Sequence, residues 1–137
     1  MKNAEKTNYE LMKYTRWYEL LNAWLCVKNN YAANFEDYFN DNNFRHIAIY
    51  GCGELGCRLF EELQHTDIKV LYMIDQNAKN IRYKCEVVSV NEFAKSEEID
   101  AVIVSPVQSF KTIKECLKKI RDVEIVSLEE VINYYVF

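Results

Sequence analysis

Short apolar runs and amphipathic stretches alternate along the chain from residue 44 onward. The runs at 47–50, 68–75 and 101–105 are almost continuously apolar, which is typical of parallel strands covered on both faces. Two shorter β-type segments end before Ser89 and Ser127, and apolar residues recur at helical spacing between the runs. The pattern predicts an α/β fold: a doubly wound parallel sheet of about five strands in the order 3-2-1-4-5, with an N-terminal helical extension.

Polar residues mark the predicted helix starts in this region. Two serines each precede a glutamate by three positions, the spacing of a reciprocal capping box: Ser89 with Glu92, and Ser127 with Glu130. Ser109 is the expected cap of a further helix, and Pro106 closes the strand before it. Two helices, the first over 54–64, should turn one apolar face toward the sheet, with Leu55, Leu59, Phe60 and Leu63 in the first and Ile113, Cys116, Leu117 and Ile120 in the second.

The first 43 residues are rich in aromatic side chains. Thr7 and Glu10 have capping-box spacing, which predicts a helix over 8–28, and Asn34 should cap a shorter helix with Phe35, Tyr38 and Phe39 facing inward. The long helix carries two apolar stripes: Leu11, Tyr14, Tyr18, Leu21 and Leu25, and beside it Trp17, Leu20, Trp24 and Val27. One stripe suffices to cover the domain, so the other either enters the same core or forms a homodimer face. The chain thus divides into an N-terminal helical extension (1–43) and a domain of strands and helices (44–137).

Composition and charge exclude several classes of function. The net charge is −4 and no dense Lys/Arg block is present, so the footprint of a nucleic-acid-binding protein is missing. The first ten residues lack the apolar segment of a secretory signal, and no apolar run is long enough to cross a bilayer. We therefore expect a cytoplasmic protein with no membrane contact.

The cysteines favour neither a disulfide framework nor a metal site. There are five, without C-x-x-C spacing or nearby histidines: Cys26, Cys52, Cys57, Cys85 and Cys116. We expect them to be small, reduced and mostly buried side chains.

All three glycines of the chain lie in one short segment, "IAIYGCGELG", at residues 47–56. Their spacing is G-x-G-x-x-G between a predicted strand and a predicted helix. Gly51 should let the chain turn off the strand, Gly53 should leave room for a pyrophosphate, and Gly56 should let the helix approach the sheet. The free N–H groups at the helix start would then point at an anionic ligand.

A carboxylate follows the next predicted strand. Asp75 ends "VLYMID" at the distance where an acidic residue accepts the ribose hydroxyls of a dinucleotide. Gln76 follows it in place of an arginine, which favours NAD over NADP. The alternative is that Asp75 only begins the turn "DQNAKN", since turns favour aspartate.

Five segments together carry a family resemblance: "HIAIYGCGELG", "YMIDQN", "VVSVNEF", "IDAVIVSP" and "EIVSLEEV". Over about residues 44–131 the chain resembles the small Rossmann-like nucleotide-binding modules of bacterial surface-polysaccharide biosynthesis. Such modules stand at the front of sugar O-acyltransferases and nucleotide-sugar dehydratases. The resemblance implies a Rossmann-like domain, whose relatives hold NAD, a nucleotide sugar or no ligand. Together with Asp75 and Gln76, this leads us to expect NAD as the cofactor ahead of NADP or a nucleotide sugar. By position it implies a phosphate loop at Gly51, Gly53 and Gly56, a ribose contact at Asp75, and Ser105 beside the crevice. With their neighbours in the loop and turn, the predicted cofactor contacts are Gly51, Cys52, Gly53, Glu54, Leu55, Gly56, Asp75, Gln76 and Ser105.

No catalytic residue is predicted. His46 opens the first strand and His65 ends the following helix, so both should lie away from the crevice. A thiol at a helix N-terminus, as at Cys52, can be reactive, but a small residue is common between two loop glycines for steric reasons.

Three functions stay open at this point. The first is a stand-alone nucleotide-binding module that senses a cofactor or assists a partner enzyme in sugar metabolism. The second is an oxidoreductase or nucleotide-sugar-modifying subunit completed by a partner chain. The third is a ligand-free interaction domain. The isolated chain is not expected to be an enzyme.

Overall fold

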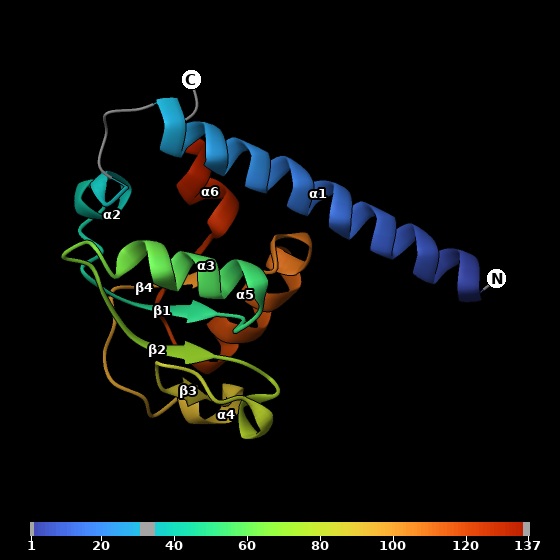
Figure 1. Cartoon of the computed structure of the whole chain (residues 1–137). Coiled ribbons are helices and arrows are strands. Elements are labelled where there is room, and N and C mark those ends of the chain that lie inside the picture. Colours follow the sequence, from blue (N-terminus) through green and yellow to red (C-terminus); the bar gives the residue numbers. More distant parts are fainter. Residues whose placement is uncertain (1, 31–34, 136–137) are drawn as a thin grey trace.

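A five-stranded, all-parallel sheet forms the centre of the molecule (Figure 1). The structure is a computed structural model that describes residues 2–30 and 35–135. The strands are β1 (His46–Tyr50), β2 (Lys69–Ile74), β3 (Val87–Val88), β4 (Ala101–Val104) and β5 (Glu124–Ser127). They lie in the order β3-β2-β1-β4-β5, which confirms the predicted topology.

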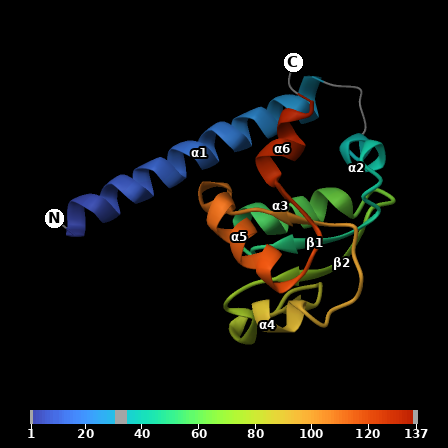
Figure 2. The same cartoon turned by 180° about the vertical axis from the view of Figure 1, so that it is seen from behind.

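Helices cover both faces of the sheet (Figure 2). They are α1 (Lys2–Asn30), α2 (Asp37–Asp41), α3 (Glu54–Leu63), α4 (Val90–Phe93), α5 (Phe110–Ile120) and α6 (Leu128–Asn133), with 3-10 turns η1 (Ala78–Asn80) and η2 (Val107–Ser109). On β1, Ile47 and Ile49 enter the core beneath α1, α2, α3 and α6, whereas Ala48 and Tyr50 enter the core beneath α4 and α5. This alternation follows from the two-residue period of a strand. Both faces are therefore apolar, as the continuous runs predicted.

The helix caps agree with the prediction only in part. The capping box at Ser89 is present, with both reciprocal hydrogen bonds to Glu92. Ser127 does cap α6, but its hydroxyl accepts from the backbone N–H of Glu129 at 3.1 Å. The predicted box with Glu130 is wrong, because that carboxylate accepts the Tyr38 hydroxyl at 2.8 Å. Ser109 occupies the cap position of α5 without a side-chain hydrogen bond.

The long N-terminal helix begins earlier than predicted. α1 starts at Lys2, and the Thr7 hydroxyl donates to the carbonyl of Asn3 at 2.7 Å, inside the helix. The predicted capping box of Thr7 and Glu10 is therefore wrong, because the preceding residues continue the helix. Asn34, the predicted cap of the second helix, lies outside the described residues.

One apolar stripe of α1 covers the domain. Leu20, Trp24 and Val27 are buried in the same core as Ile47, and Trp17 packs partly against it. Trp24 stacks on Phe35 with the ring centroids 5.8 Å apart. The other stripe stays exposed: Leu11, Tyr14, Tyr18, Leu21 and Leu25. The two stripes predicted for this helix therefore have different environments.

The inward faces of the helices are largely as predicted. Tyr38 and Phe39 are buried, and so are the four apolar residues named for α3, Leu55, Leu59, Phe60 and Leu63. Leu117 of α5 is buried, but Cys116 is exposed.

The cysteines differ from the prediction in their burial. All five are free thiols, yet Cys26 and Cys116 are exposed and the other three are half-buried, so the expectation of mostly buried side chains is wrong. Among the described residues, no group of three or more ligating side chains could hold a metal ion. No helix in the described ranges has the length and hydropathy needed to cross a membrane.

Candidate functional site

The centre of the sheet contains a topological switch point. β1 and β4 are neighbours, and the register pairs Tyr50 with Val104 at their carboxyl ends. The connection from β1 runs through α3 on one face, and the connection from β4 runs through α5 on the other. In open α/β sheets, ligands bind in the crevice outside the carboxyl ends of such a strand pair. Gly51 and Ser105 directly follow these two strands.

Two of the three glycines are required by the backbone itself. Gly51 has a φ of +96°, and a Cβ there would lie 2.6 Å from the Ser105 Oγ. A Cβ on Gly56 would lie 1.8 Å from the carbonyl oxygen of Gly51. The predicted reasons for these two glycines, a sharp turn and a close helix approach, therefore hold.

The third glycine has free space around it. Gly53 caps α3 in an extended conformation (φ −106°, ψ −161°), and a Cβ there would meet no atom within 4 Å. No side chain caps this end of α3. The first N–H groups of a helix lack intrahelical partners and lie at the positive end of its dipole. This end of α3 can therefore donate to an anion.

The neighbouring positions contribute mainly backbone. Glu54, the first residue of α3, has an exposed side chain, whereas the Leu55 side chain is buried in the core. Leu55 can therefore offer a ligand only its N–H group.

Asp75 lies beside the glycine turn. One carboxylate oxygen accepts from the Cys52 N–H at 2.9 Å, and the other accepts from the Asn77 N–H at 2.8 Å. The contact with Asn77 is the turn role that the sequence left open as the alternative. The contact with Cys52 joins the carboxylate to the glycine turn. Each carboxylate oxygen has two acceptor sites, so a ribose diol could still donate to both.

Sequence reasoning missed Tyr50, whose phenol lies close to this carboxylate. Burial raises the pKa of Tyr50, the negative charge of Asp75 raises it further, and a hydrogen bond with the Gln76 side chain lowers it. Gln76 is otherwise exposed. No local signal distinguishes Tyr50 from the other apolar strand residues, because the proximity arises between β1 and the end of β2.

Ser105 lies beneath the turn and is 3% exposed. Its hydroxyl donates to the carbonyl oxygens of Tyr50, at 2.8 Å, and Gly51, at 3.1 Å. The single hydroxyl proton is shared between these two acceptors. Ser105 therefore fastens the end of β4 to the glycine turn.

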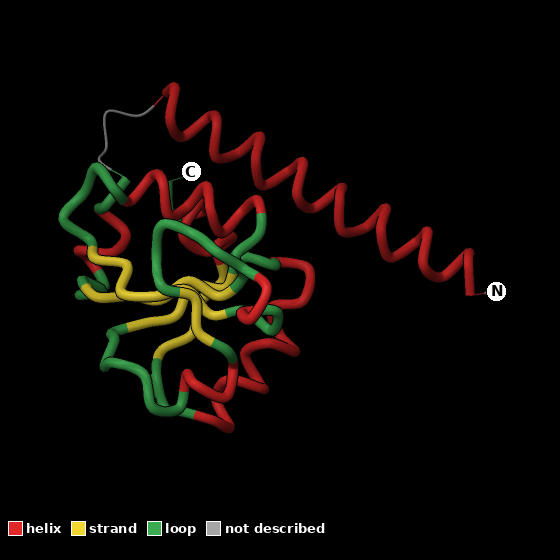
Figure 3. The backbone as a smooth tube through the Cα atoms, turned by 60° about the horizontal axis from the view of Figure 1, so that its bottom comes forward, coloured by secondary structure: helices red, strands yellow, loops and turns green. Residues whose placement is uncertain are grey.

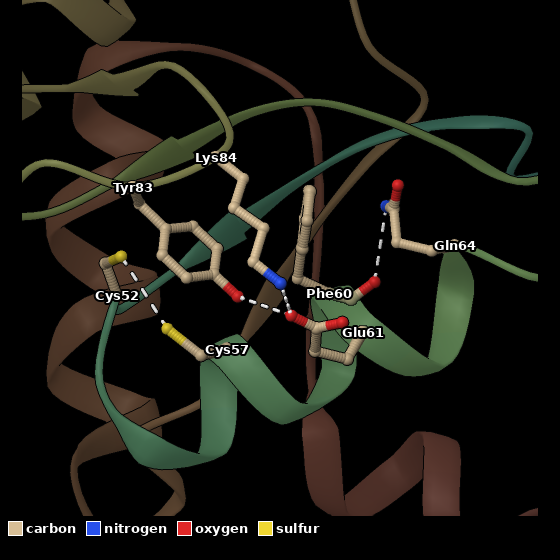
Figure 4. Close-up of polar contacts among 7 residues, drawn as sticks. All are labelled: Cys52, Cys57, Phe60, Glu61, Gln64, Tyr83 and Lys84. Carbon is tan, nitrogen blue, oxygen red and sulfur yellow. Dashed lines mark hydrogen bonds and ion pairs between the residues drawn. The ribbon is translucent and has the colours of Figure 1, made fainter.

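The Cys52 side chain points toward Cys57 of α3 and Tyr83, in the segment before β3 (Figure 4). Its sulfur lies 3.9 Å from that of Cys57, next to Tyr83, whose hydroxyl donates to Glu61 at 3.4 Å. Lys84 forms an ion pair with the same carboxylate. Burial, reinforced by Cys57, raises the pKa of Cys52 to about 12. The thiol is therefore protonated at neutral pH, the opposite of an activated cysteine.

The histidines are not brought to the glycine turn, although one of the two larger cavities reaches the start of α3 at Glu54. His46 opens β1 at the amino end of the sheet, 3.9 Å from Asp100. His65 lines a cavity of about 740 Å³ along α3 together with Arg58 and Glu62. A second cavity, of about 820 Å³, lies between Arg16 of α1, β5 and α6. Neither cavity is lined by a glycine.

Comparison with known proteins gives one match. A family model described as C2185-like, N-terminal, matches residues 43–126. This range contains all of the sheet except the last residue of β5, and it includes the glycine turn. No curated protein and no solved structure matches the chain.

Proposed function

The chain belongs to the C2185-like family, and from this premise and the geometry of the glycine turn we propose that it binds an NAD-type dinucleotide as a stand-alone module. The observation that carries the proposal is the contrast among the three glycines. Gly51 and Gly56 are explained by contacts within the protein, whereas a Cβ at Gly53 would enter open space next to the uncapped start of α3. Room for a close approach to the backbone is what a pyrophosphate requires there.

Two groups would hold the dinucleotide. The N–H groups at the start of α3 donate to the pyrophosphate, and the Asp75 carboxylate accepts from the ribose hydroxyls. The contact between Asp75 and the Cys52 N–H supports this role, because it holds the carboxylate at the edge of the loop. A bound NAD would supply a nicotinamide for hydride transfer if a second protein brought a substrate.

The same carboxylate favours NAD over NADP. A 2′-phosphate would meet the negative charge of Asp75, and the following Gln76 offers a neutral amide in place of a cation. We therefore expect NADP to bind at least tenfold more weakly than NAD, a difference of about 1.4 kcal/mol.

A sensing or accessory role accounts best for a binding site without catalytic side chains. Among the described residues, neither histidine lies at the crevice, and burial keeps the nearest thiol protonated. The sequence resemblance to modules of polysaccharide biosynthesis suggests a partner enzyme in sugar metabolism. Turnover by the isolated chain would instead favour the enzyme alternative.

The experiment is a titration with NAD, NADH, NADP, ADP and a UDP-sugar, followed by thermal shift and calorimetry. Ligand at a hundredfold excess over Kd should add about 2.7 kcal/mol to the stability. Gly53→Val should abolish binding and leave the fold intact, because the added side chain enters open space. Asp75→Asn should weaken binding at least tenfold, while Asp122→Asn, an exposed carboxylate near β5, should not. Indifference of the wild type to every nucleotide would refute the proposal and favour a ligand-free interaction domain.

A further inference from the structure

α1 carries an exposed apolar stripe that its own domain does not use. Leu11, Tyr14, Tyr18, Leu21 and Leu25 are between 37% and 71% exposed. They recur at alternating steps of three and four residues, which is the spacing of the seam of a coiled coil. The residues that α1 packs on the domain belong to a different stripe. These five residues, here called the seam, are left exposed by the chain's own domain.

The N-terminal half of α1 also lacks support from the domain. It projects beyond the α/β body (Figures 1 and 3), and every side chain of residues 3–12 is exposed. The first side-chain hydrogen bonds to the body are those of Arg16 with Glu129, at 3.0 Å, and of Trp17 with Gln108, at 2.9 Å. A helical segment shorter than about 12 residues is marginal in water without packing. A partner that packs on the N-terminal half of α1 would therefore stabilise the helix there.

We propose that the seam binds the seam of a second copy of this chain, with the two α1 helices antiparallel. The stripe is close to symmetric about Tyr18, because Leu11 and Leu25 each lie seven residues from it, and Tyr14 and Leu21 lie four and three residues from it. A two-fold axis at Tyr18 therefore places Leu11 of one copy opposite Leu25 of the other. Such an isologous contact closes at two copies.

The antiparallel arrangement is favoured by the position of the body on α1. The body packs only against the C-terminal half of the helix. Antiparallel pairing lays the projecting half of each helix along the supported half of the other, whereas parallel pairing leaves both projecting halves beyond the bodies. The helix positions that flank the seam on its solvent side are Asn8, Thr15 and Asn22, which are exposed and uncharged. Pairing of two seams therefore brings no like charges together on that side.

The area is sufficient for a specific dimer. Full burial of the five exposed side chains in both copies would remove about 1,300 Å² from water, within the range of specific interfaces. Tyrosine is also enriched in the cores of interfaces, and two of the five side chains are tyrosines.

The first experiment measures the mass of the full chain by light scattering or sedimentation equilibrium. We expect twice the chain mass of 16.3 kDa at micromolar concentration. Tyr18→Glu should give a monomer with unchanged circular dichroism of the domain. Tyr9→Glu is the matched control, because Tyr9 is 46% exposed on the opposite side of α1, and it should stay dimeric. A monomeric wild type, or a dimer that survives Tyr18→Glu, would overturn the proposal.

The second experiment tests the direction of pairing. Leu11→Glu alone should dissociate the dimer, and adding Leu25→Lys should restore it, because antiparallel helices bring the two opposite charges together. In a parallel pair the like charges would face each other, and the double variant would stay monomeric. Recruitment of a monomeric wild type to anionic vesicles would assign the seam to a membrane surface and also refute the dimer. None of these outcomes depends on nucleotide binding, so the two proposals fail separately.

Discussion

Replacement of Gly56 by alanine tests whether the close approach of α3 to β1 is a packing requirement. The added Cβ would lie 1.8 Å from the carbonyl oxygen of Gly51 and 3.0 Å from the Ser105 Oγ. A backbone oxygen cannot rotate away, so α3 must move outward by about 1.6 Å or more to reach an ordinary contact distance. That movement separates Leu55 and Leu59, both buried, from the sheet.

The size of the effect can be worked out from two opposing terms. Overpacking costs about 1–3 kcal/mol or more, and a contact between backbone atoms belongs at the upper end of this range. Alanine recovers up to about 1 kcal/mol through its higher helix propensity. We therefore expect a net loss of about 2 kcal/mol, which lowers the urea midpoint by about 1 M for a chain of this size.

Urea unfolding, followed by tryptophan fluorescence, measures this loss through Trp17 and Trp24. The matched control is Gly53→Ser, because a side chain there meets open space and serine is a favourable cap. The control should keep its stability within about 0.5 kcal/mol of the wild type. Equal midpoints for Gly56→Ala and the wild type, or a similar loss for both variants, would refute the packing argument.

Other contacts lead to three more expectations. Arg121→Ala should lower the free energy of unfolding, measured in urea, by about 1–3 kcal/mol, because the guanidinium donates to three backbone carbonyls in and after α4. An unchanged urea midpoint would contradict this. Alkylation at about pH 8 should label the exposed thiols of Cys26 and Cys116 before that of Cys52, since burial raises the pKa of Cys52 to about 12. Peptide mass spectrometry reads the order of labelling, and early labelling of Cys52 would disprove this expectation. Burial also raises the pKa of Tyr135 to about 12. A raised pKa stabilises the fold below the unfolded value of about 10, and this contribution is lost as the pH rises through the folded value, so the urea midpoint should fall between about pH 10 and 12; a flat midpoint over this range would count against it.

Much of the fold could be predicted because it follows from local patterns. The apolar runs at β2 and β4 indicate strands covered on both faces, and right-handed crossovers then restrict the strand order. Ser89 and Glu92 form their capping box within one helical turn, so their spacing alone specifies the contact. The glycine spacing likewise predicts the turn at Gly51 and the close approach at Gly56.

Contacts between distant segments could not be predicted in this way. Glu130 has capping-box spacing, yet it binds Tyr38 of α2, 92 residues away. The carboxylate of Asp75 reaches the Cys52 N–H only because β1 and β2 are neighbours. Spacing also predicts that α1 has two apolar stripes, but not which of them meets the sheet.

By itself, the sequence determined the succession of strands and helices and the glycine turn, because each depends on residues within a few turns of one another. The sheet order followed from that succession through the rule of right-handed crossovers. Only the tertiary structure decided which stripe of α1 is buried, where the Ser105 hydroxyl donates and which glycine has open space. The physical reason is that these properties depend on the packing of elements far apart in the chain, where burial and the competition for hydrogen-bond partners select one arrangement among several that local spacing allows.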